Sequence, residues 1–244
     1  MASIEHVVQR NLHTVERRIA AACARADRPR EAVTLVAVTK TRPLAAIRAA
    51  YACGLRDFGE NRIEELVPRA AELHDEFAAD PPRWHMIGHI QSRKAADVAV
   101  GANLVHSLDS VKLAMRLNRF AAEAEIVLPV LVELNVSGEA SKEGLPAWTD
   151  ELLATAVAEL AGLEGLANLA VHGLMTMAPF VADPEDARPV FRRLRQVQKL
   201  LRERLPWSTW DDLSMGMTND YAVAIEEGAT MVRIGRAIFG EEKG

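Results

Sequence analysis

The sequence predicts an α/β protein: a single (β/α)8 TIM barrel spanning residues 1–244, with one extra helix at its N-terminal end. Three observations predict this fold. Eight short apolar, mostly β-branched runs alternate with seven longer Ala- and Leu-rich helical segments. The 244 residues match the roughly 200 to 250 that one barrel occupies. No internal repeat, low-complexity tract or Pro/Gly/Ser-rich linker marks a domain boundary.

The first element is an amphipathic helix. Its apolar residues recur at helical spacing, at Ile4, Val7, Val8, Leu12, Val15 and Ile19. Because only RAIFGEEKG follows the eighth predicted strand, we expect this helix to share in the outer cover of the barrel or to close its bottom.

The alternating segments follow in order along the chain. The predicted strands are 33–38, 57–58, 84–88, 104–106, 130–136, 169–174, 212–215 and 231–235. The predicted helices are 43–53, 61–79, 92–100, 110–124, 146–161, 184–205 and 219–227. Several open with proline or a short polar residue, which is typical of a first helical turn.

A doubly wound open sheet shows the same alternation, and it is the competing architecture. Such sheets usually have fewer strands and a glycine-rich phosphate loop after the first strand. Here the first turn is VTKTRP, without G-x-G-x-x-G, so the barrel is favoured. The barrel in turn predicts that chemistry gathers at the C-terminal ends of the strands.

Composition excludes several classes of function. The formal net charge is −5, the isoelectric point is about 5.8 and the mean hydropathy is −0.02, so no bulk positive field is available for nucleic acid or an anionic membrane. The N-terminal segment is charged throughout and lacks the apolar region of a secretory signal. The two cysteines, Cys23 and Cys53, do not indicate a disulfide framework. We therefore expect a cytoplasmic protein.

Lys40 is the first candidate for chemistry. It follows LVAV closely, so its side chain should emerge from the top of a buried strand, where desolvation favours the neutral amine that a Schiff base requires. Nearby cations such as Arg233 would favour the neutral amine further. The alternative is a lysine that extends to solvent or pairs with Glu60.

Residues 213–240 are the second candidate. In α/β barrels, the loops after strands seven and eight and a short extra helix commonly form a phosphate site. Here Gly235 would let the backbone approach an anion, the amides of Gly235 and Arg236 would face it, and the hydroxyl of Ser214 or Thr218 would add a donor. The alternative is that Gly216 and Gly235 serve tight turns only. A reactive lysine opposite a phosphate site implies pyridoxal 5'-phosphate.

The motifs TLVAVTKTRP, DFGENRIEEL, WHMIGHIQSRK, VHSLDS, LVELNVSGEASKEGL, GLMTMAP and LSMGMTNDYAVAIEEGATMVRIGRAIFG together resemble the pyridoxal phosphate homeostasis protein family. Members of that family have the barrel of the alanine racemase N-terminal domain, and the resemblance covers nearly the whole chain. It implies that pyridoxal phosphate forms an aldimine with Lys40. It also implies that Ser214 and the backbone of Gly235 and Arg236 bind the phosphate, and that Arg233 faces the pyridine nitrogen.

The same resemblance places Asn61 beside the cofactor, and Met175 and His89 around its ring and the barrel mouth. Two features depart from the family pattern, Arg93 in QSRK and the terminal FGEEKG, and they leave the surface at those two places undetermined.

Other candidates have simpler interpretations. His85 and His89 lie in an apparent strand and loop without further ligands, so no metal site is expected. His172 is interpreted as structural. The arginines of helix 184–205 are expected to form a solvated outer face. For Glu133, within the fifth strand, both a position facing the helices and one at the barrel mouth remain open.

Two classes of function follow. The first is a protein that holds pyridoxal phosphate and passes it to acceptors such as apo-enzymes, without robust turnover. The second is a racemase or decarboxylase on the same barrel. Racemase-like enzymes receive an opposing acid/base from a further domain, whereas this sequence stops soon after the eighth strand, and Arg233 would disfavour a protonated ring. We therefore expect a non-enzymatic, monomeric carrier. A class I aldolase using Lys40 is a third interpretation, which a bound chromophore would distinguish.

Overall fold

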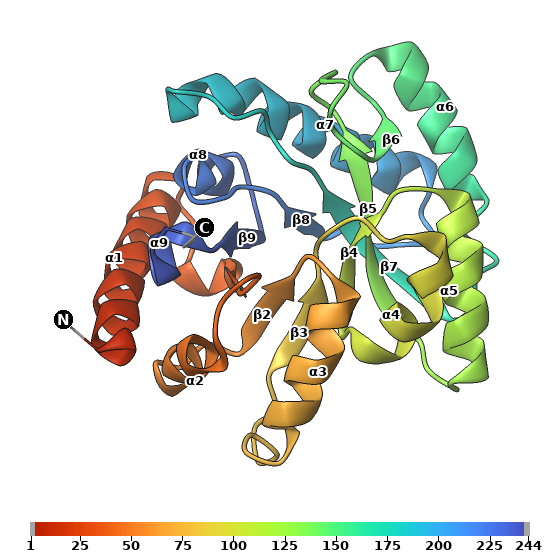
Figure 1. The fold of residues 1–244 in the computed structure, drawn as a ribbon. Coiled ribbons are helices and arrows are strands. Elements are labelled where there is room, and N and C mark those ends of the chain that lie inside the picture. The colour runs from red at the N-terminus through yellow and green to blue at the C-terminus, as the bar shows by residue number, and fades with distance from the viewer. Residues whose placement is uncertain (1–2, 242–244) are drawn as a thin grey trace.

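Eight parallel strands close into a barrel in the computed structural model, which describes residues 3–241 (Figure 1). The strands are β1 (Thr34–Val38), β2 (Asp57–Glu60), β3 (Arg83–Met86), β4 (Leu104–Leu108), β5 (Leu128–Asn135), β7 (Leu169–Met175), β8 (Asp212–Ser214) and β9 (Met231–Ile234). Each strand pairs with its neighbour in the sequence, β4 pairs with β5, and β9 returns to β1. The predicted (β/α)8 barrel is confirmed.

Helices between the strands form the outer layer. They are α2 (Leu44–Ala52), α3 (Ile63–His74), α4 (Ala95–Gly101), α5 (Val111–Glu123), α6 (Asp150–Ala161), α7 (Arg188–Arg204) and α8 (Tyr221–Glu226), and a short α9 (Arg236–Phe239) follows β9. Single 3-10 turns precede β1, α4 and α7, at Arg30–Ala32, Ser92–Lys94 and Pro184–Ala187.

The extra helix α1 (Ile4–Arg25) completes this layer. It packs against α2, α8 and α9, and so covers the gap that the short C-terminal helix leaves (Figure 1). Its stripe of Val8, Leu12, Val15 and Ile19 is buried, as the spacing predicts. Of the two expected placements, sharing in the outer cover is therefore the observed one.

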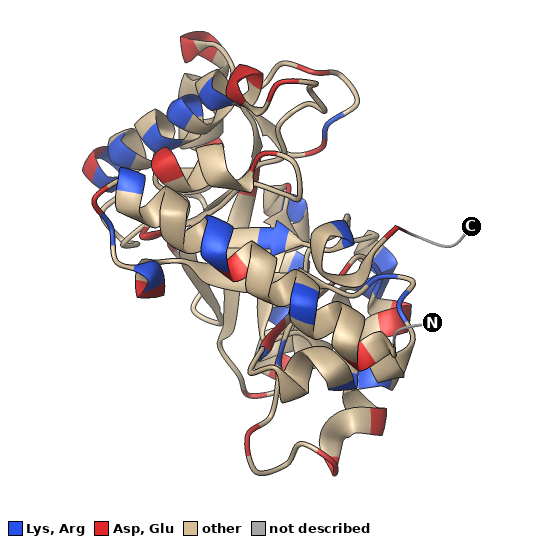
Figure 2. Cartoon of the chain, turned by 90° about the vertical axis from the view of Figure 1, so that its left-hand side faces the viewer, with Lys and Arg blue, Asp and Glu red and all other residues tan. Residues whose placement is uncertain are grey.

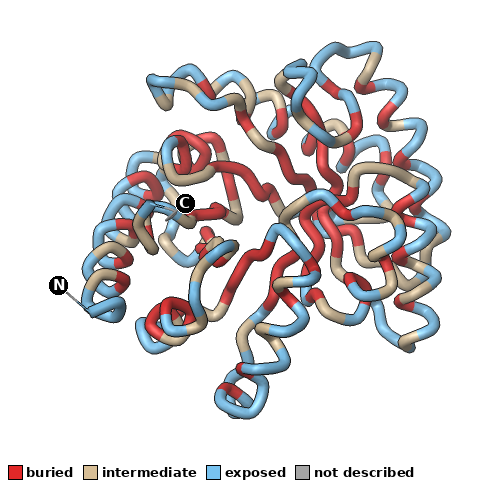
Figure 3. Tube along the Cα trace, viewed as in Figure 1, coloured by how far each residue is buried: buried red, intermediate tan, exposed pale blue. Residues whose placement is uncertain are grey.

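Burial follows the two layers. Figure 3 shows buried chain along the strands and exposed chain on the outward faces of the helices. The predicted stripe of α7, with Phe191, Leu194, Val197 and Leu201, is buried against the barrel. Basic and acidic residues both lie on the outer helices (Figure 2). Arg188 of α7, for example, forms ion pairs of 2.6 and 2.7 Å with Glu226 and Glu227.

Two predicted helix boundaries were wrong, each because of a local contact. The helix predicted over 61–79 ends at His74, and the turn after it places Phe77 on the ring of Tyr51, with centroids 3.7 Å apart. The helix predicted from 146 starts at Asp150. Leu145–Pro146 instead form β6, a two-residue strand on the end of β5, and Thr149 Oγ1 caps α6 by accepting from the Leu152 amide at 3.3 Å.

Within residues 3–241, no helix is long and apolar enough to span a bilayer. Cys23 is buried in α1 and Cys53 is exposed after α2, and both are free thiols. Of the terminal FGEEKG, residues 242–244 lie outside the described residues.

Candidate functional site

A cavity of about 610 Å³ lies at the C-terminal ends of the strands, where the barrel fold predicts chemistry. Its walls come mainly from β1, β9 and the segments after β1, β2, β3, β5, β7, β8 and β9. Six predicted site residues line it: Lys40, Asn61, Thr218, Arg233, Gly235 and Arg236. The folded chain therefore brings together residues that are up to 196 positions apart, Lys40 and Arg236.

The lining residues suit an anion joined to a flat apolar group. Five lining side chains are basic, Lys40, Arg42, Lys142, Arg233 and Arg236, whereas only Asp220 and Glu241 are acidic. Apolar side chains cover another part of the wall, including Val38, Ile87, Met177, Pro179 and Phe180. The volume falls within the roughly 300 to 1,000 Å³ typical of small-molecule sites. A phosphorylated pyridine of the size of pyridoxal phosphate fits both the charge and the volume.

Lys40 lies two residues after β1 and is half-buried. A buried cluster beside it fixes the backbone of this turn. Thr39 Oγ1 donates to Glu60 Oε1 at 2.6 Å, and Arg69 forms an ion pair with the same carboxylate. Arg69 also donates to the carbonyl oxygens of Thr39 and Arg42, at 2.8 and 3.0 Å. Glu60 therefore helps to hold the turn that presents Lys40.

The loop after β8 is shaped by Gly216 and Asp220. Gly216 has φ of +94°, and a Cβ there would lie 2.6 Å from Ala224 Cβ, so the turn requires glycine. Asp220 Oδ1 accepts from the Met217 amide at 2.6 Å, and Gly216 O accepts from the Arg233 amide at 3.0 Å. These bonds hold Thr218 at the wall of the cavity.

Gly235 lies against the end of β1, where a Cβ would be 3.2 Å from Val38 O. Arg236, which begins α9, is exposed at the cavity wall. Together with Thr218, these residues form the part of the site that the sequence assigned to a phosphate. Gly216 serves the turn after β8, whereas Gly235 allows a close backbone approach to β1 and lines the cavity.

Arg233 is the charged group at the base of the cavity, and it is only 4% exposed. Its guanidinium donates to Ser214 Oγ at 2.5 Å and to Thr176 O at 3.0 Å. Burial lowers the pKa of Arg233 to about 10, while Glu133 and Asp220 act in the opposite direction. The guanidinium therefore remains charged at neutral pH.

Glu133 on β5 is 3% exposed, and its carboxyl interacts with the charge of Arg233, which lines the cavity. Burial raises the pKa of Glu133 to about 7, against the opposing effect of Arg233. Its charge consequently changes within the physiological range.

Three predicted site residues do not line this cavity. Ser214 is fully buried, and its hydroxyl lies between Arg233 and His106 Nδ1, which is 2.8 Å away. Met175 is fully buried and packs with Leu104 and Leu131. His89 lines a neighbouring cavity of about 560 Å³, together with Asn61 and Arg93, and its Nδ1 lies 3.1 Å from Asp109.

The sequence reasoning missed Arg42 and Asp220 at the cavity, and it had no role for Lys142. Arg42 donates to Gly240 O at 2.6 Å and so ties α9 to the turn of Lys40. Lys142 comes from the loop after β5, which Asn135 organises by accepting from the amides of Ser137 and Gly138, at 3.2 and 3.0 Å. Lys142 follows β5 in the sequence, which could have indicated a position at the cavity. The loop is long, however, and its course was not predictable from the sequence.

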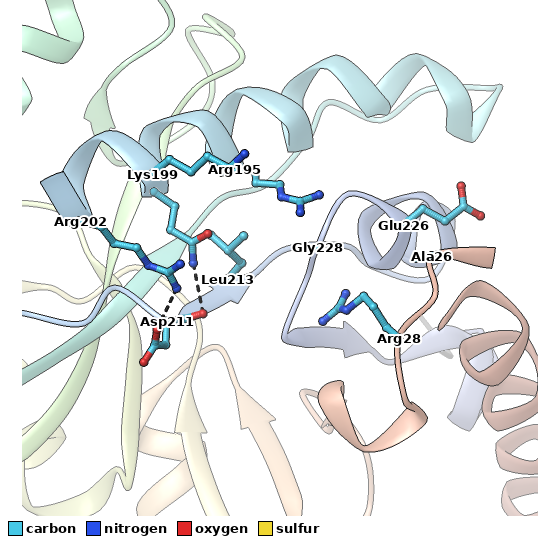
Figure 4. Close-up of a pocket in the computed structure, with 10 residues that line it drawn as sticks. Ala26, Arg28, Arg195, Lys199, Arg202, Asp211, Leu213, Glu226 and Gly228 are labelled. Carbon is cyan, nitrogen blue, oxygen red and sulfur yellow. Dashed lines mark hydrogen bonds and ion pairs between the residues drawn. The ribbon is translucent and has the colours of Figure 1, made fainter. Parts of the chain in front are cut away.

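A further cavity of about 300 Å³ lies between α7 and the segments before β1, β8 and β9 (Figure 4). It is also basic, with Arg28, Arg195, Lys199 and Arg202, but Arg202 pairs with Asp211 at 2.8 Å. Its residues precede strands, so it lies at the opposite end of the barrel from Lys40.

Among residues 3–241, no group of His, Cys, Asp and Glu side chains is arranged to hold a metal ion. His172 is half-exposed, with Nδ1 3.9 Å from Asp212. Arg93 donates to Gln91 Oε1 at 3.0 Å, on the surface after β3.

Comparisons with known proteins agree with this geometry. Residues 11–243 match the family model described as alanine racemase, N-terminal domain. The pyridoxal phosphate homeostasis protein of Pseudomonas aeruginosa is 42% identical over 233 residues, which cover 96% of this chain and 95% of that protein.

Solved structures give the same result. PipY of Synechococcus elongatus with PLP bound is 35% identical, with a TM-score of 0.78, over 93% of this chain and 100% of PipY. Alanine racemase from Corynebacterium glutamicum shares the fold, with a TM-score of 0.69 and 15% identity, over 98% of this chain and 62% of the racemase.

Proposed function

The chain belongs to the pyridoxal phosphate homeostasis protein family, on the barrel of the alanine racemase N-terminal domain, and from that premise we propose that it binds pyridoxal 5'-phosphate at the Lys40 cavity and takes part in the homeostasis of that cofactor. The observation that carries the proposal is the convergence of Lys40, Thr218, Arg233 and Arg236 on one cavity of suitable volume. The PLP-bound relative supports the identity of the ligand.

Each residue then has a chemical task. When bound, pyridoxal phosphate supplies an aldehyde that reacts with primary amines and a pyridine ring that withdraws electrons. Lys40 supplies the amine that would link the cofactor covalently. Thr218 and Arg236, with the backbone at Gly235, would hold the phosphate through charge-assisted hydrogen bonds. Arg233 would face the ring nitrogen, and Asn61 would contact the cofactor from the loop after β2.

We infer that the protein holds and releases the cofactor without robust turnover of amino acids. Arg233 supports this inference, because a buried guanidinium held by Ser214 and Thr176 remains charged and cannot accept a proton from the ring nitrogen. A fixed positive charge there disfavours ring protonation and weakens electron withdrawal from a substrate carbanion. Exchange of the cofactor with an incoming amine, or its transfer to an apo-enzyme, needs no such stabilisation.

The alternative is a weak racemase or decarboxylase, and isotope exchange separates the two. The cofactor-loaded protein is incubated with a panel of L-amino acids in deuterated water, with Lys40→Ala as the control. The proposal predicts release of the cofactor to the amines with negligible deuterium at Cα. Deuterium incorporation at rates near a typical kcat of about 10 s⁻¹, lost in Lys40→Ala, would establish an enzyme instead.

We also propose that the protein acts as a monomer in the cytoplasm. The mixture of basic and acidic residues on the outer helices supports a solvated surface (Figure 2). Sedimentation equilibrium at micromolar concentration should give a mass near 26.8 kDa, and a dimer mass would refute this part of the proposal.

A further inference from the structure

Two buried histidines have no task in the proposed function. His85 on β3 is 3% exposed and His106 on β4 is fully buried. Their rings are hydrogen-bonded to each other, with His85 Nδ1 2.8 Å from His106 Nε2. Both belong to motifs that the sequence analysis singled out, WHMIGH and VHSLDS.

The pair is the middle of a longer chain that crosses the barrel. At one end, His85 Nε2 lies 3.0 Å from Asp57 Oδ1, at the start of β2. Asp57 also pairs with the exposed Arg83, at 2.5 and 2.7 Å. At the other end, His106 Nδ1 lies 2.8 Å from Ser214 Oγ, which is the group that Arg233 contacts. This hydrogen-bonded chain of side chains thus links the N-terminal end of the barrel to the base of the Lys40 cavity.

The charged groups at the two ends, Asp57 and Arg233, determine which atom donates and which accepts in each hydrogen bond. Burial acts to raise the pKa of Asp57, but hydrogen bonds from His85 and Arg83 outweigh it and lower the pKa below its usual value, so Asp57 is a carboxylate and only accepts. A guanidinium only donates, so Arg233 donates to Ser214. The hydroxyl has a single proton, and His106 Nδ1 is its acceptor at 2.8 Å.

The histidine tautomers follow from these constraints. If His106 Nδ1 accepts from Ser214, its proton is on Nε2 and is donated to His85 Nδ1. His85 then also carries its proton on Nε2, and donates it to Asp57. Burial and the neighbouring Arg233 and His85 lower the pKa of His106 well below its usual value, which agrees with a neutral ring. Each ring nitrogen of both histidines then has a partner of the right kind.

We propose that Asp57, His85 and His106 are positioning residues. Their hydrogen bonds require Ser214 to donate its proton to His106. The Ser214 oxygen then accepts from Arg233 and holds its guanidinium at the base of the cofactor cavity. This inference rests on the proposed binding of pyridoxal phosphate. It assigns Ser214 to Arg233, in place of the phosphate contact expected from the sequence. A disturbance at Asp57 should therefore reach the cavity through the chain.

The direction of the chain is testable on the protein without cofactor. Long-range proton–nitrogen NMR at pH 7.5 distinguishes the tautomers of histidine rings, with His85→Gln and His106→Gln providing the assignments. We expect the Nε2–H form for both rings. An Nδ1–H tautomer or a doubly protonated ring at either position would overturn the inference.

Binding titrations test the link to Arg233. His106→Leu removes the acceptor for the Ser214 proton, and should weaken binding of both pyridoxal phosphate and unphosphorylated pyridoxal about ten- to hundredfold, the range for a lost hydrogen bond to a charged group. His106→Gln retains an acceptor and a donor, and should recover most of that loss. The visible absorption maximum of the bound cofactor should shift in His106→Leu and return in His106→Gln.

A second pair of variants acts at the far end of the chain. Asp57→Leu removes the acceptor, and should weaken binding in the same way as His106→Leu. Arg83→Met breaks the exposed ion pair while leaving the carboxylate, and should leave affinity within about twofold of wild type. Unchanged affinity in both His106→Leu and Asp57→Leu would overturn this inference but would leave the proposed function standing. Failure of the wild-type protein to bind pyridoxal phosphate would overturn the proposed function, and with it the role of the chain.

Discussion

Replacing Glu133 with glutamine should change how stability depends on pH. The carboxyl of Glu133 is 3% exposed, and burial raises its pKa from 4.5 to about 7. Since the folded-state pKa is higher than that of the unfolded chain, the native state binds more protons between about pH 4.5 and 7. The free energy of unfolding therefore falls as the pH rises through this window, and the contribution of neutral Glu133 is lost above pH 7.

The size of the effect follows from the same shift. The difference of about 2.5 pH units corresponds to at most about 3 to 4 kcal/mol, at about 1.4 kcal/mol per unit. Glutamine has nearly the same shape but does not titrate. Relative to wild type, Glu133→Gln should therefore gain about 2 to 3 kcal/mol of stability between pH 5 and pH 8, with most of the gain between pH 5 and pH 7.

Urea unfolding of both proteins at pH 5, 6, 7 and 8, with m-values compared, measures this difference. Other buried groups titrate too: burial raises the pKa of Glu60, Asp212 and Asp220. Their contributions are common to both proteins and cancel in the difference. Glu159→Gln, at an exposed position on α6, controls for the loss of one carboxylate. A difference between wild type and Glu133→Gln that stays constant from pH 5 to 8 would refute the raised pKa.

Three further substitutions test the site and its support. Gly216→Ala should destabilise the fold by more than about 1 kcal/mol, because φ is +94° and the new Cβ would meet Ala224; thermal unfolding measures this, and an unchanged Tm would contradict the geometry. Thr218→Val should weaken binding of pyridoxal phosphate about tenfold or more without affecting pyridoxal, whereas an equal loss for both ligands would show that Thr218 does not contact the phosphate. Arg69→Met leaves the buried Glu60 carboxylate without its cation and should cost about 3 to 5 kcal/mol, which denaturant unfolding measures; a loss below about 1 kcal/mol would show that the pair is dispensable.

The fold and most of the cavity were predictable because both depend on local pattern and chain order. Strand and helix periodicity alternates along the whole chain, and polar residues after parallel strands must meet at one end of a barrel. Lys40, Thr218 and Arg236 come two to four residues after the ends of their strands, and each lines the cavity. The position of α1 was left open because its apolar stripe shows that it packs, but not where.

The remaining features depend on the direction in which each side chain points. Ser214 ends β8, and whether its hydroxyl faces the mouth or the interior is set by the register of the closed barrel. The chain from Asp57 to His106 has no sequence signal either. Its members lie 28 and 21 positions apart, and they meet only because neighbouring strands place them side by side. The shifted pKa of Glu133 likewise arises from burial that no motif reveals.

Peptide mapping after borohydride reduction tests most directly whether Lys40 holds the cofactor. The protein is loaded with pyridoxal phosphate, its visible spectrum is recorded, and the linkage is reduced, digested and analysed by mass spectrometry. We predict a visible chromophore that borohydride bleaches, with the mass of the cofactor on the peptide that contains Lys40, and a folded but colourless Lys40→Ala protein. A label on Lys94 or Lys142 in the wild-type protein, or colour that persists in Lys40→Ala, would contradict the assignment of the site.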